Sequence, residues 1–348
     1  MPSILIVGPS WVGDMVMAQS LFKELVQQQP DTSIDVLAPA WSKALLARMP
    51  EVSGTIEMPM GHGQLQLARR YRLGRALRSK GYSQVIVLPN SFKSALVPYW
   101  AKIPKRTGYT GEMRWGLLND ARKLDKQKLT MTVQRFVALA SAAENQGFPV
   151  IQPPKLCIDP GNVKDALDRL GMEKPGRPVL AICPGAEFGS AKRWPQEYYA
   201  EVAIYCIQQG WQVWIFGSDR DILVADKISG TVNSNYCTSL AGKTALEDAI
   251  DLMSLADVVV SNDSGLMHVA AALDRKLIAV YGSSDPGFTP PLNQQASILS
   301  LGLDCSPCFR RECPPGHLNC LRDLKPERVI KLITANSPPP IEGERIED

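Results

Sequence analysis

The first half of the chain alternates short apolar runs with longer segments in which apolar residues recur at helical spacing. The apolar runs, each short enough for one buried strand, occupy residues 4–7, 33–38, 52–58 and 84–88. The segments with helical spacing lie between them, at residues 13–28, 42–49 and 64–80. Strands that alternate with helices in this way predict a parallel sheet wrapped by helices.

The same pattern begins again in the second half of the chain. Strand-like runs return at residues 179–183, 213–216, 257–260 and 277–281, with helix-like segments at 195–209, 221–229 and 246–255. Between the two halves, residues 146–178 are rich in Pro and Gly and contain one short helical pattern at 163–170. We therefore predict an α/β fold of two Rossmann-like domains, residues 1–160 and 175–348, with a linker at 161–174. Ligands are expected in a cleft between the two parallel sheets.

Composition and cysteine usage indicate a cytoplasmic protein. The chain has 348 residues and eight cysteines, half of which crowd into residues 305–320, unlike the even spacing of a secreted disulfide scaffold. The N-terminal apolar run ends after four residues and has no basic segment before it, so it is interpreted as a strand and not as a signal peptide. No uncharged run approaches the ~18 residues that a transmembrane helix needs. The Pro-rich, acidic tail from Ser337 is expected to fray.

The net charge of +3 conceals opposite charges in the two halves. Residues 1–150 contain 19 Lys/Arg and 10 Asp/Glu, whereas the remainder contains 19 and 25. Much of the excess lies on the helical segment that carries Arg69, Arg72 and Arg75. Such a surface suits an anionic lipid headgroup or a phosphorylated sugar, or it is simply a solvated helix face. A nucleic-acid partner is not expected, because the chain lacks an aromatic RNP-type pattern.

A glycine-bearing corner, GPSWVGD at residues 8–14, joins the first strand to the first helix. Its spacing matches a Walker A loop, but the Lys-Ser/Thr pair that contacts phosphate and metal is missing, which excludes a P-loop NTPase. The corner retains Gly13 and Asp14. A carboxylate at a helix start either complements the helix dipole or faces a ligand at the carboxyl edge of the sheet, and both interpretations stay open.

Two corners of the second half carry groups suited to a nucleotide. The loop after residues 179–183 contains Gly185, Ser190 and Lys192, and its lysine can neutralise a diphosphate or is a surface cation. The corner after residues 213–216 carries Asp221. This carboxylate is placed like the one that binds a ribose diol in dinucleotide folds, or it caps the next helix.

The segment NDSGLMH at residues 262–268 leads from a buried strand into a helix. Free N–H groups and the positive end of the helix dipole suit a phosphate at such a corner. Asp263 or Ser264 acting only as a helix cap is the alternative. The recurrence of glycine-bearing corners favours a nucleotide site, with candidates Asp263, Ser264 and Gly265.

Four cysteines, Cys305, Cys308, Cys313 and Cys320, lie within 16 residues. Four thiols at this distance are able to hold zinc. The spacing departs from the paired C-x-x-C knuckles, so reduced thiols in a tight loop and an oxidation-prone surface loop remain as alternatives. No metal is assigned to them.

Taken together, the motifs resemble the heptosyltransferase family of bacterial lipopolysaccharide synthesis, which are nucleotide-sugar glycosyltransferases of the GT-B fold. The resemblance covers nearly the whole chain. It is carried by G-D at 13–14, P-G-A…K-x-W-P at 184–195, G-x-x-x-D at 217–221 and N-D-S-G-x-x-H at 262–268. The cysteine segment is similar to the branch of the family that adds the second heptose.

The resemblance implies an inverting transfer from ADP-heptose to the first heptose of the lipopolysaccharide inner core, with Asp14 as the general base. It implies that Lys192 contacts the ADP phosphates and Asp221 the ribose or adenosine. The remaining donor contacts implied are Gly185, Asp263, Ser264, Gly265 and His268. Glu187 and Phe188 stand where first-heptose enzymes have paired threonines, which leaves Ser190 as the candidate hydroxyl.

No metal or other cofactor is expected, because protein cations and helix dipoles take that role in the family. The implied acceptor is a phosphorylated Kdo-lipid A that carries one heptose, met at the cytoplasmic face of the inner membrane. Gly13 and the three arginines, Arg69, Arg72 and Arg75, are placed on the acceptor side. Two alternatives stay open: another GT-B transferase with a different heptose position or nucleotide sugar, and a non-catalytic nucleotide-sugar-binding protein.

Overall fold

The computed structural model describes residues 2–61, 63–142 and 148–335. The chain forms two compact units. The first unit comprises Met1–Asp159, Ala271–Asp274 and Pro286–Asn293, and the second comprises Pro160–Ala270, Arg275–Asp285 and Gln294–Asp348. The predicted acidic tail from Ser337 lies outside the described residues.

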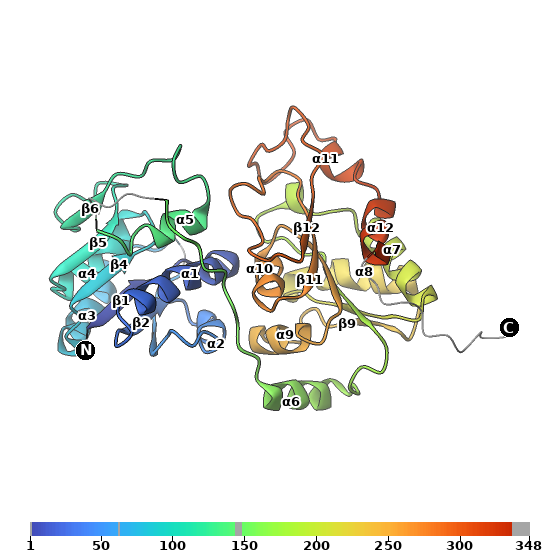
Figure 1. The fold of residues 1–348 in the computed structure, drawn as a ribbon, viewed down its shortest axis with the longest axis horizontal. Helices are drawn as coiled ribbons and strands as arrows, with labels where there is room; N and C mark the ends of the chain where they lie inside the picture. The colour runs from blue at the N-terminus through green and yellow to red at the C-terminus, as the bar shows by residue number, and fades with distance from the viewer. Residues whose placement is uncertain (1, 62, 143–147, 336–348) are drawn as a thin grey trace. The chain divides into compact units, whose positions relative to one another are not determined.

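The first unit is built on a six-stranded parallel sheet of order β3-β2-β1-β4-β5-β6, with helices around it (Figure 1). Its strands are β1 Ser3–Val7, β2 Ser33–Ala38, β3 Gly54–Glu57, β4 Gln84–Val87, β5 Lys105–Tyr109 and β6 Asp120–Arg122. Its helices are α1 Val12–Gln28, α2 Ser42–Leu46, α3 Leu67–Leu77, α4 Leu96–Trp100 and α5 Thr132–Val137, with 3-10 turns η1 Arg78–Lys80 and η2 Phe92–Ala95. The central strands are runs of Val, Ile and Leu that are buried on both faces, as a parallel sheet covered by helices requires.

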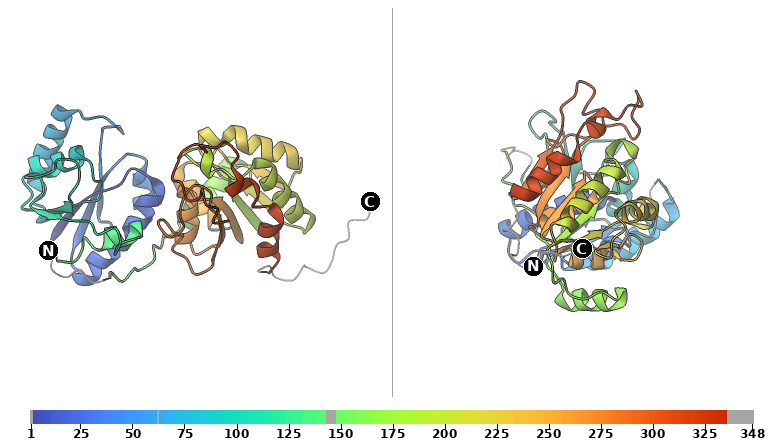
Figure 2. Two further views of the ribbon diagram at one scale, coloured as in Figure 1. Left: turned by 90° about the horizontal axis from the view of Figure 1, so that it is seen from above. Right: turned by 90° about the vertical axis from the view of Figure 1, so that its right-hand side faces the viewer.

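The second unit repeats this plan, with a parallel sheet of order β12-β11-β10-β7-β8-β9. Its strands are β7 Val179–Cys183, β8 Gln212–Ile215, β9 Cys237–Ser239, β10 Val258–Asn262, β11 Lys276–Val280 and β12 Ala296–Leu299. Its helices are α6 Pro160–Leu170, α7 Gln196–Gln208, α8 Ile222–Val232, α9 Leu246–Met253, α10 Gly265–Ala272, α11 Asn319–Arg322 and α12 Pro326–Ala335, with 3-10 turns η3 Ser190–Lys192 and η4 Asp219–Asp221. The two further views in Figure 2 show helices on both sides of each sheet. The predicted α/β fold with two parallel sheets is confirmed.

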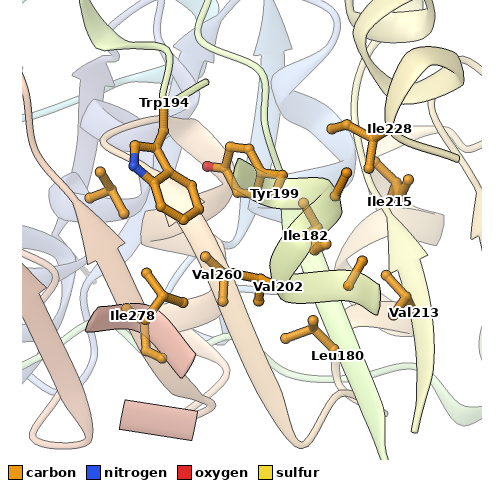
Figure 3. Close-up of a cluster of buried hydrophobic side chains, with 14 of the residues drawn as sticks. Leu180, Ile182, Trp194, Tyr199, Val202, Val213, Ile215, Ile228, Val260 and Ile278 are labelled. Carbon is orange, nitrogen blue, oxygen red and sulfur yellow. The ribbon is translucent and has the colours of Figure 1, made fainter. Parts of the chain in front are cut away.

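One face of the second sheet is covered by α7, α8 and α12 through a cluster of buried apolar side chains (Figure 3). Trp194 and Tyr199 belong to this cluster, and their rings meet edge to face with centroids 4.9 Å apart. The indole Nε1 of Trp194 donates to the carbonyl oxygen of Leu324 at 2.8 Å, so its polar atom is satisfied inside the core. This packing fixes the loop between β7 and α7, which carries Lys192.

The segment expected to link the two domains contains a packed helix. Helix α6 lies against α9, and its residue Arg169 forms an ion pair of 2.8 Å with Asp248. The side-chain amide of Asn162 donates to Asp251 at 2.9 Å. These contacts make α6 part of the second unit.

Candidate functional site

Both sheets have the strand order of a Rossmann fold, in which the order reverses between the first and fourth strands. In the second unit this reversal lies between β7 and β10, which are hydrogen-bonded neighbours. Ligands of open α/β sheets bind outside the carboxyl ends of the strands at such a reversal. The candidates Gly185 and Asp263 follow these two strands, and the structure therefore brings their corners together.

Lys192 ends the short turn η3 and forms an ion pair with Asp263, with 2.5 Å between Nζ and Oδ2. The two side chains are 17% and 4% exposed. A pair this deeply buried needs good geometry, and removing one partner leaves an uncompensated charge behind. Asp263 therefore holds in place the lysine that the sequence assigns to the donor phosphates.

Asn262 joins three segments of this site through its side chain. Its Nδ2 donates to the carbonyl oxygen of Pro184 at 2.6 Å. Its Oδ1 accepts from the backbone amide of Trp194 and from the hydroxyl of Tyr199, both at 3.0 Å. Sequence reasoning did not assign a role to Asn262, although its place directly before Asp263 in the motif was an available signal.

Burial controls the ionisation of the groups around the ion pair. Desolvation lowers the pKa of His268 to about 4, an effect that Asp263 opposes and Lys192 reinforces. Burial also raises the pKa of Tyr281 well above its usual value, with Asp263 and Asp285 adding to the shift. His268 and Tyr281 are therefore neutral at physiological pH, so the charges at the centre of the site are those of the Lys192–Asp263 pair.

Asp221 caps its own helical turn and packs against the corner after β7. Its Oδ2 accepts from the backbone amide of Ser218 at 3.0 Å and from the Ser218 hydroxyl at 2.8 Å. A Cβ at Gly185 would lie 2.5 Å from the Asp221 carboxyl carbon, so the Asp221 side chain is in tight contact with the backbone of Gly185. Capping of its own helical turn thus explains the hydrogen bonds of one Asp221 carboxylate oxygen. The loops that follow β7 and β8 come into contact where Asp221 meets Gly185.

The remaining donor-side candidates lie next to these corners. Gly265 is the first residue of α10, and the hydroxyl of the preceding half-buried Ser264 lies 3.3 Å from that of Ser261. Ser190 is exposed at the start of η3, two residues before Lys192. All the donor-side candidates therefore belong to the second unit.

In the first unit, Gly13 and Asp14 lie in the first turn of α1, shortly after β1. This is the point where the first sheet reverses its strand order, between β1 and β4. Gly13 is buried and Asp14 is half-buried. A carboxylate in this turn complements the positive end of the helix dipole.

The first unit also has an acid-free region, residues 58–111, which contains ten Lys/Arg and no Asp/Glu. Within it, α3 packs closely on α4, since a Cβ at Gly74 would lie 2.8 Å from the carbonyl oxygen of Val97. Arg69, Arg72 and Arg75 are all exposed on α3. The basic candidates thus lie on a surface where no carboxylate of the same segment can neutralise them.

Aromatic side chains accompany these arginines. Tyr71 meets Trp100 edge to face, with centroids 5.6 Å apart, and the Arg75 guanidinium lies 5.9 Å from the Tyr71 ring centroid. Arg106 lies 5.8 Å from the ring centroid of Tyr99. Tyr71 and Tyr99 are 42% and 44% exposed. Sequence reasoning assigned the charge of this surface but missed its aromatic residues.

Comparison with known proteins identifies the family. The model of glycosyltransferase family 9 (heptosyltransferase) matches residues 70–319. The chain belongs to this family. Its sequence is 48% identical over 337 residues to lipopolysaccharide heptosyltransferase 2 of Salmonella typhimurium, and the match covers 94% of this chain and 96% of that one. It is 46% identical to the Escherichia coli enzyme of the same name, covering 95% and 97%.

A solved structure supports the same assignment. The structure titled E. coli ADP-heptose lps heptosyltransferase II superimposes with a TM-score of 0.84 at 43% identity, covering 96% of this chain and 98% of that chain. The fold of this family 9 glycosyltransferase is therefore the GT-B architecture that the motifs predicted.

The four clustered cysteines of this glycosyltransferase lie near one another between β12 and α12. The Cys320 thiol is buried, and its pKa is raised by burial and further by Cys305, Cys313 and Cys308. All four are free thiols. Among the described residues, no group of three or more His, Cys, Asp and Glu side chains is arranged to hold a metal ion.

Within the part of the chain that the structure describes, no helix is both long enough and apolar enough to cross a membrane.

Proposed function

We propose that this glycosyltransferase moves heptose from ADP-heptose to the first heptose of the lipopolysaccharide inner core. The observation that carries the proposal is the 46–48% identity, over nearly the full length, with enzymes named lipopolysaccharide heptosyltransferase 2. The geometry of the second unit agrees with a nucleotide-sugar donor, because a half-buried lysine and the start of α10 lie at the strand reversal of its sheet.

Donor binding is assigned to this end of the second sheet. Lys192 supplies a positive charge for the diphosphate, and the backbone amides at the start of α10, beginning with Gly265, supply hydrogen-bond donors. Asp263 positions the lysine before the donor arrives. Because these groups neutralise the leaving diphosphate, the proposed reaction needs no metal cofactor, and full activity is expected in a chelator.

Asp14 is assigned as the general base. The acceptor hydroxyl attacks the anomeric carbon, the bond from that carbon to the ADP oxygen breaks, and Asp14 accepts the hydroxyl proton as ADP departs. An ordinary aspartate, with a pKa of about 3.9, is a weak base at neutral pH. Proton transfer is therefore expected late in the reaction, after bond formation has made the hydroxyl acidic.

The acceptor is assigned to the first unit, as a phosphorylated Kdo-lipid A that carries one heptose. The acid-free region presents Arg69, Arg72 and Arg75 without carboxylates nearby in sequence, and this suits the phosphates and carboxylates of such an acceptor. Exposed Tyr71 and Tyr99 suit a lipid–water boundary, where aromatic rings with one polar end are favoured. We infer peripheral association with the cytoplasmic face of the inner membrane.

The proposal is tested by incubating purified protein with ADP-heptose and two truncated lipid acceptors, one with a single heptose and one with none. The product is read by mass and the released ADP is quantified. We expect the one-heptose acceptor to gain one heptose with equimolar ADP release, and the heptose-free acceptor to stay unchanged. Transfer only to the heptose-free acceptor would place the enzyme at another step of core assembly, and binding of ADP-heptose without transfer to either acceptor would make it a binding protein.

A further inference from the structure

A fourth corner adjoins the donor site of the second unit, and no motif singled it out. It is the segment Tyr281-Gly282-Ser283-Ser284, which follows β11. Strand β11 is the neighbour of β10, and the backbone amide of Asp263 donates to the carbonyl oxygen of Val280 at 3.1 Å. The chain therefore leaves β11 directly beside the carboxylate that holds Lys192.

The backbone of this corner is fixed against the lysine loop. The amide of Ser283 donates to the carbonyl oxygen of Ala191 at 3.2 Å, and its carbonyl oxygen accepts from the amide of Phe309 at 2.7 Å. A Cβ at Gly282 would lie 2.9 Å from the same Ala191 oxygen, so the two segments are in tight contact. Ser283 is thus hydrogen-bonded to Ala191, the residue that directly precedes Lys192.

The side chains of the two serines are buried, and their hydroxyls make no hydrogen bond to the described residues. Ser283 and Ser284 are 1% and 4% exposed. Their hydroxyl oxygens are inaccessible to solvent and have no hydrogen-bond partner among the described residues. A buried hydroxyl without a hydrogen-bond partner destabilises the folded state, and such groups are rare in native proteins. Two of them in consecutive positions beside an anion-binding site point to a ligand that satisfies them.

We propose that the hydroxyls of Ser283 and Ser284 bind the donor by donating hydrogen bonds to its diphosphate oxygens. The inference rests on the proposed function, because the ligand is the donor of that reaction. A hydroxyl suits this place, since it donates to a phosphate oxygen without adding a second buried cation beside Lys192. The expected contribution is roughly tenfold in affinity for each hydroxyl, the effect of one hydrogen bond to a charged group.

The test compares Ser283→Ala, Ser284→Ala and the double variant with wild type by calorimetry with ADP and with ADP-heptose, and by the melting temperature without ligand. We expect the dissociation constants for ADP and ADP-heptose to rise by the same factor, roughly tenfold for each single variant. The ligand-free melting temperature should stay unchanged or rise, because each change removes an unpaired buried hydroxyl. Ser42→Ala is the matched control: Ser42 is fully buried but its hydroxyl donates to Pro39 at 2.6 Å, so this variant should melt lower and bind ADP normally.

Unchanged ADP affinity in the serine variants would overturn the inference, and so would a lower melting temperature with normal affinity, which would mean a structural role. Loss of affinity for ADP-heptose alone would move the contact to the sugar and overturn the assignment to the diphosphate. Failure of the proposed function has a different signature, because it is read from the lipid acceptors: the one-heptose acceptor would gain no heptose, whatever the ADP affinity of the serine variants. Wild-type protein that binds neither ADP nor ADP-heptose would overturn both proposals.

Discussion

Replacing His268 with glutamine should remove a defined part of the protein's sensitivity to acid. His268 is 5% exposed on α10, and burial lowers its pKa to about 4, from an ordinary value of 6.5. The unfolded chain therefore binds a proton on this side chain at a higher pH than the folded protein does. The free energy of unfolding must then fall as the pH drops from about 6.5 towards 4.

The size of this effect follows from the shift in pKa. One pKa unit corresponds to about 1.4 kcal/mol, so the whole shift corresponds to about 3 kcal/mol of folding free energy that is lost once both states are protonated. Between pH 7.5 and pH 5.0 the loss assigned to His268 is about 2 kcal/mol. A loss of this size is large beside the 5–15 kcal/mol of stability that is typical of a domain.

The assay is urea unfolding of wild type and His268→Gln at pH 7.5 and at pH 5.0. Glutamine is polar and does not titrate, so the variant should lose about 2 kcal/mol less than wild type between the two pH values, whatever its stability at pH 7.5. His317→Gln, in the cysteine loop and only half-buried, is measured in parallel as a second histidine variant. If wild type and His268→Gln lose stability equally on acidification, His268 is not held neutral by burial and this description of the site is wrong.

Three further outcomes follow from the assigned roles. Lys192→Met should raise the dissociation constants of ADP and ADP-heptose together, by roughly 10- to 100-fold for a lost charged phosphate contact, and calorimetry with unchanged ADP affinity would remove the lysine from the donor site. Changing Arg69, Arg72 and Arg75 to Glu should raise the Michaelis constant for the lipid acceptor in a salt-dependent way and leave ADP affinity unchanged. If the Michaelis constant neither rises nor depends on salt, these arginines only form a solvated helix face. Elemental analysis of purified protein should find no stoichiometric metal on the Cys305–Cys320 segment, and one equivalent of zinc whose removal lowers the melting temperature would contradict this.

The elements were predictable where burial alone decides them. The apolar run at residues 179–183 coincides with β7, which is buried at every position. The run at 33–38 coincides with β2, in which Ser33 and Asp35 are half-buried and the other positions are buried. The returns of Ala271–Asp274 and Pro286–Asn293 to the first unit were not predictable, since they depend on which distant segments pack together. The packing of α6 on α9 escaped prediction for the same reason, as Pro and Gly around it indicated a linker.

The individual residues of the candidate site were predictable from the sequence, but the contacts between them were not. Lys192 and Asp263 were each assigned to the donor from their own motifs, yet the ion pair between them joins segments 71 residues apart. The cross-linking role of Asn262 is hidden for the same reason. Ser283 gave no signal, because a serine after a strand is common and only its burial without a partner marks it.

The central claim, that the second unit binds the donor while Asp14 of the first unit removes the acceptor proton, is tested most directly by Asp14→Asn. The change keeps the size and the helix-start position of the side chain, so folding and ADP affinity should stay close to wild type. Loss of a general base should lower the turnover number by ~10²–10⁴. Turnover and ADP affinity are measured on the same preparation, with Asp31→Asn, an exposed aspartate of the same unit, as control. The account predicts a collapse of turnover with ADP affinity within about threefold of wild type. Turnover within about threefold of wild type would contradict it and reduce Asp14 to a residue that stabilises the start of α1.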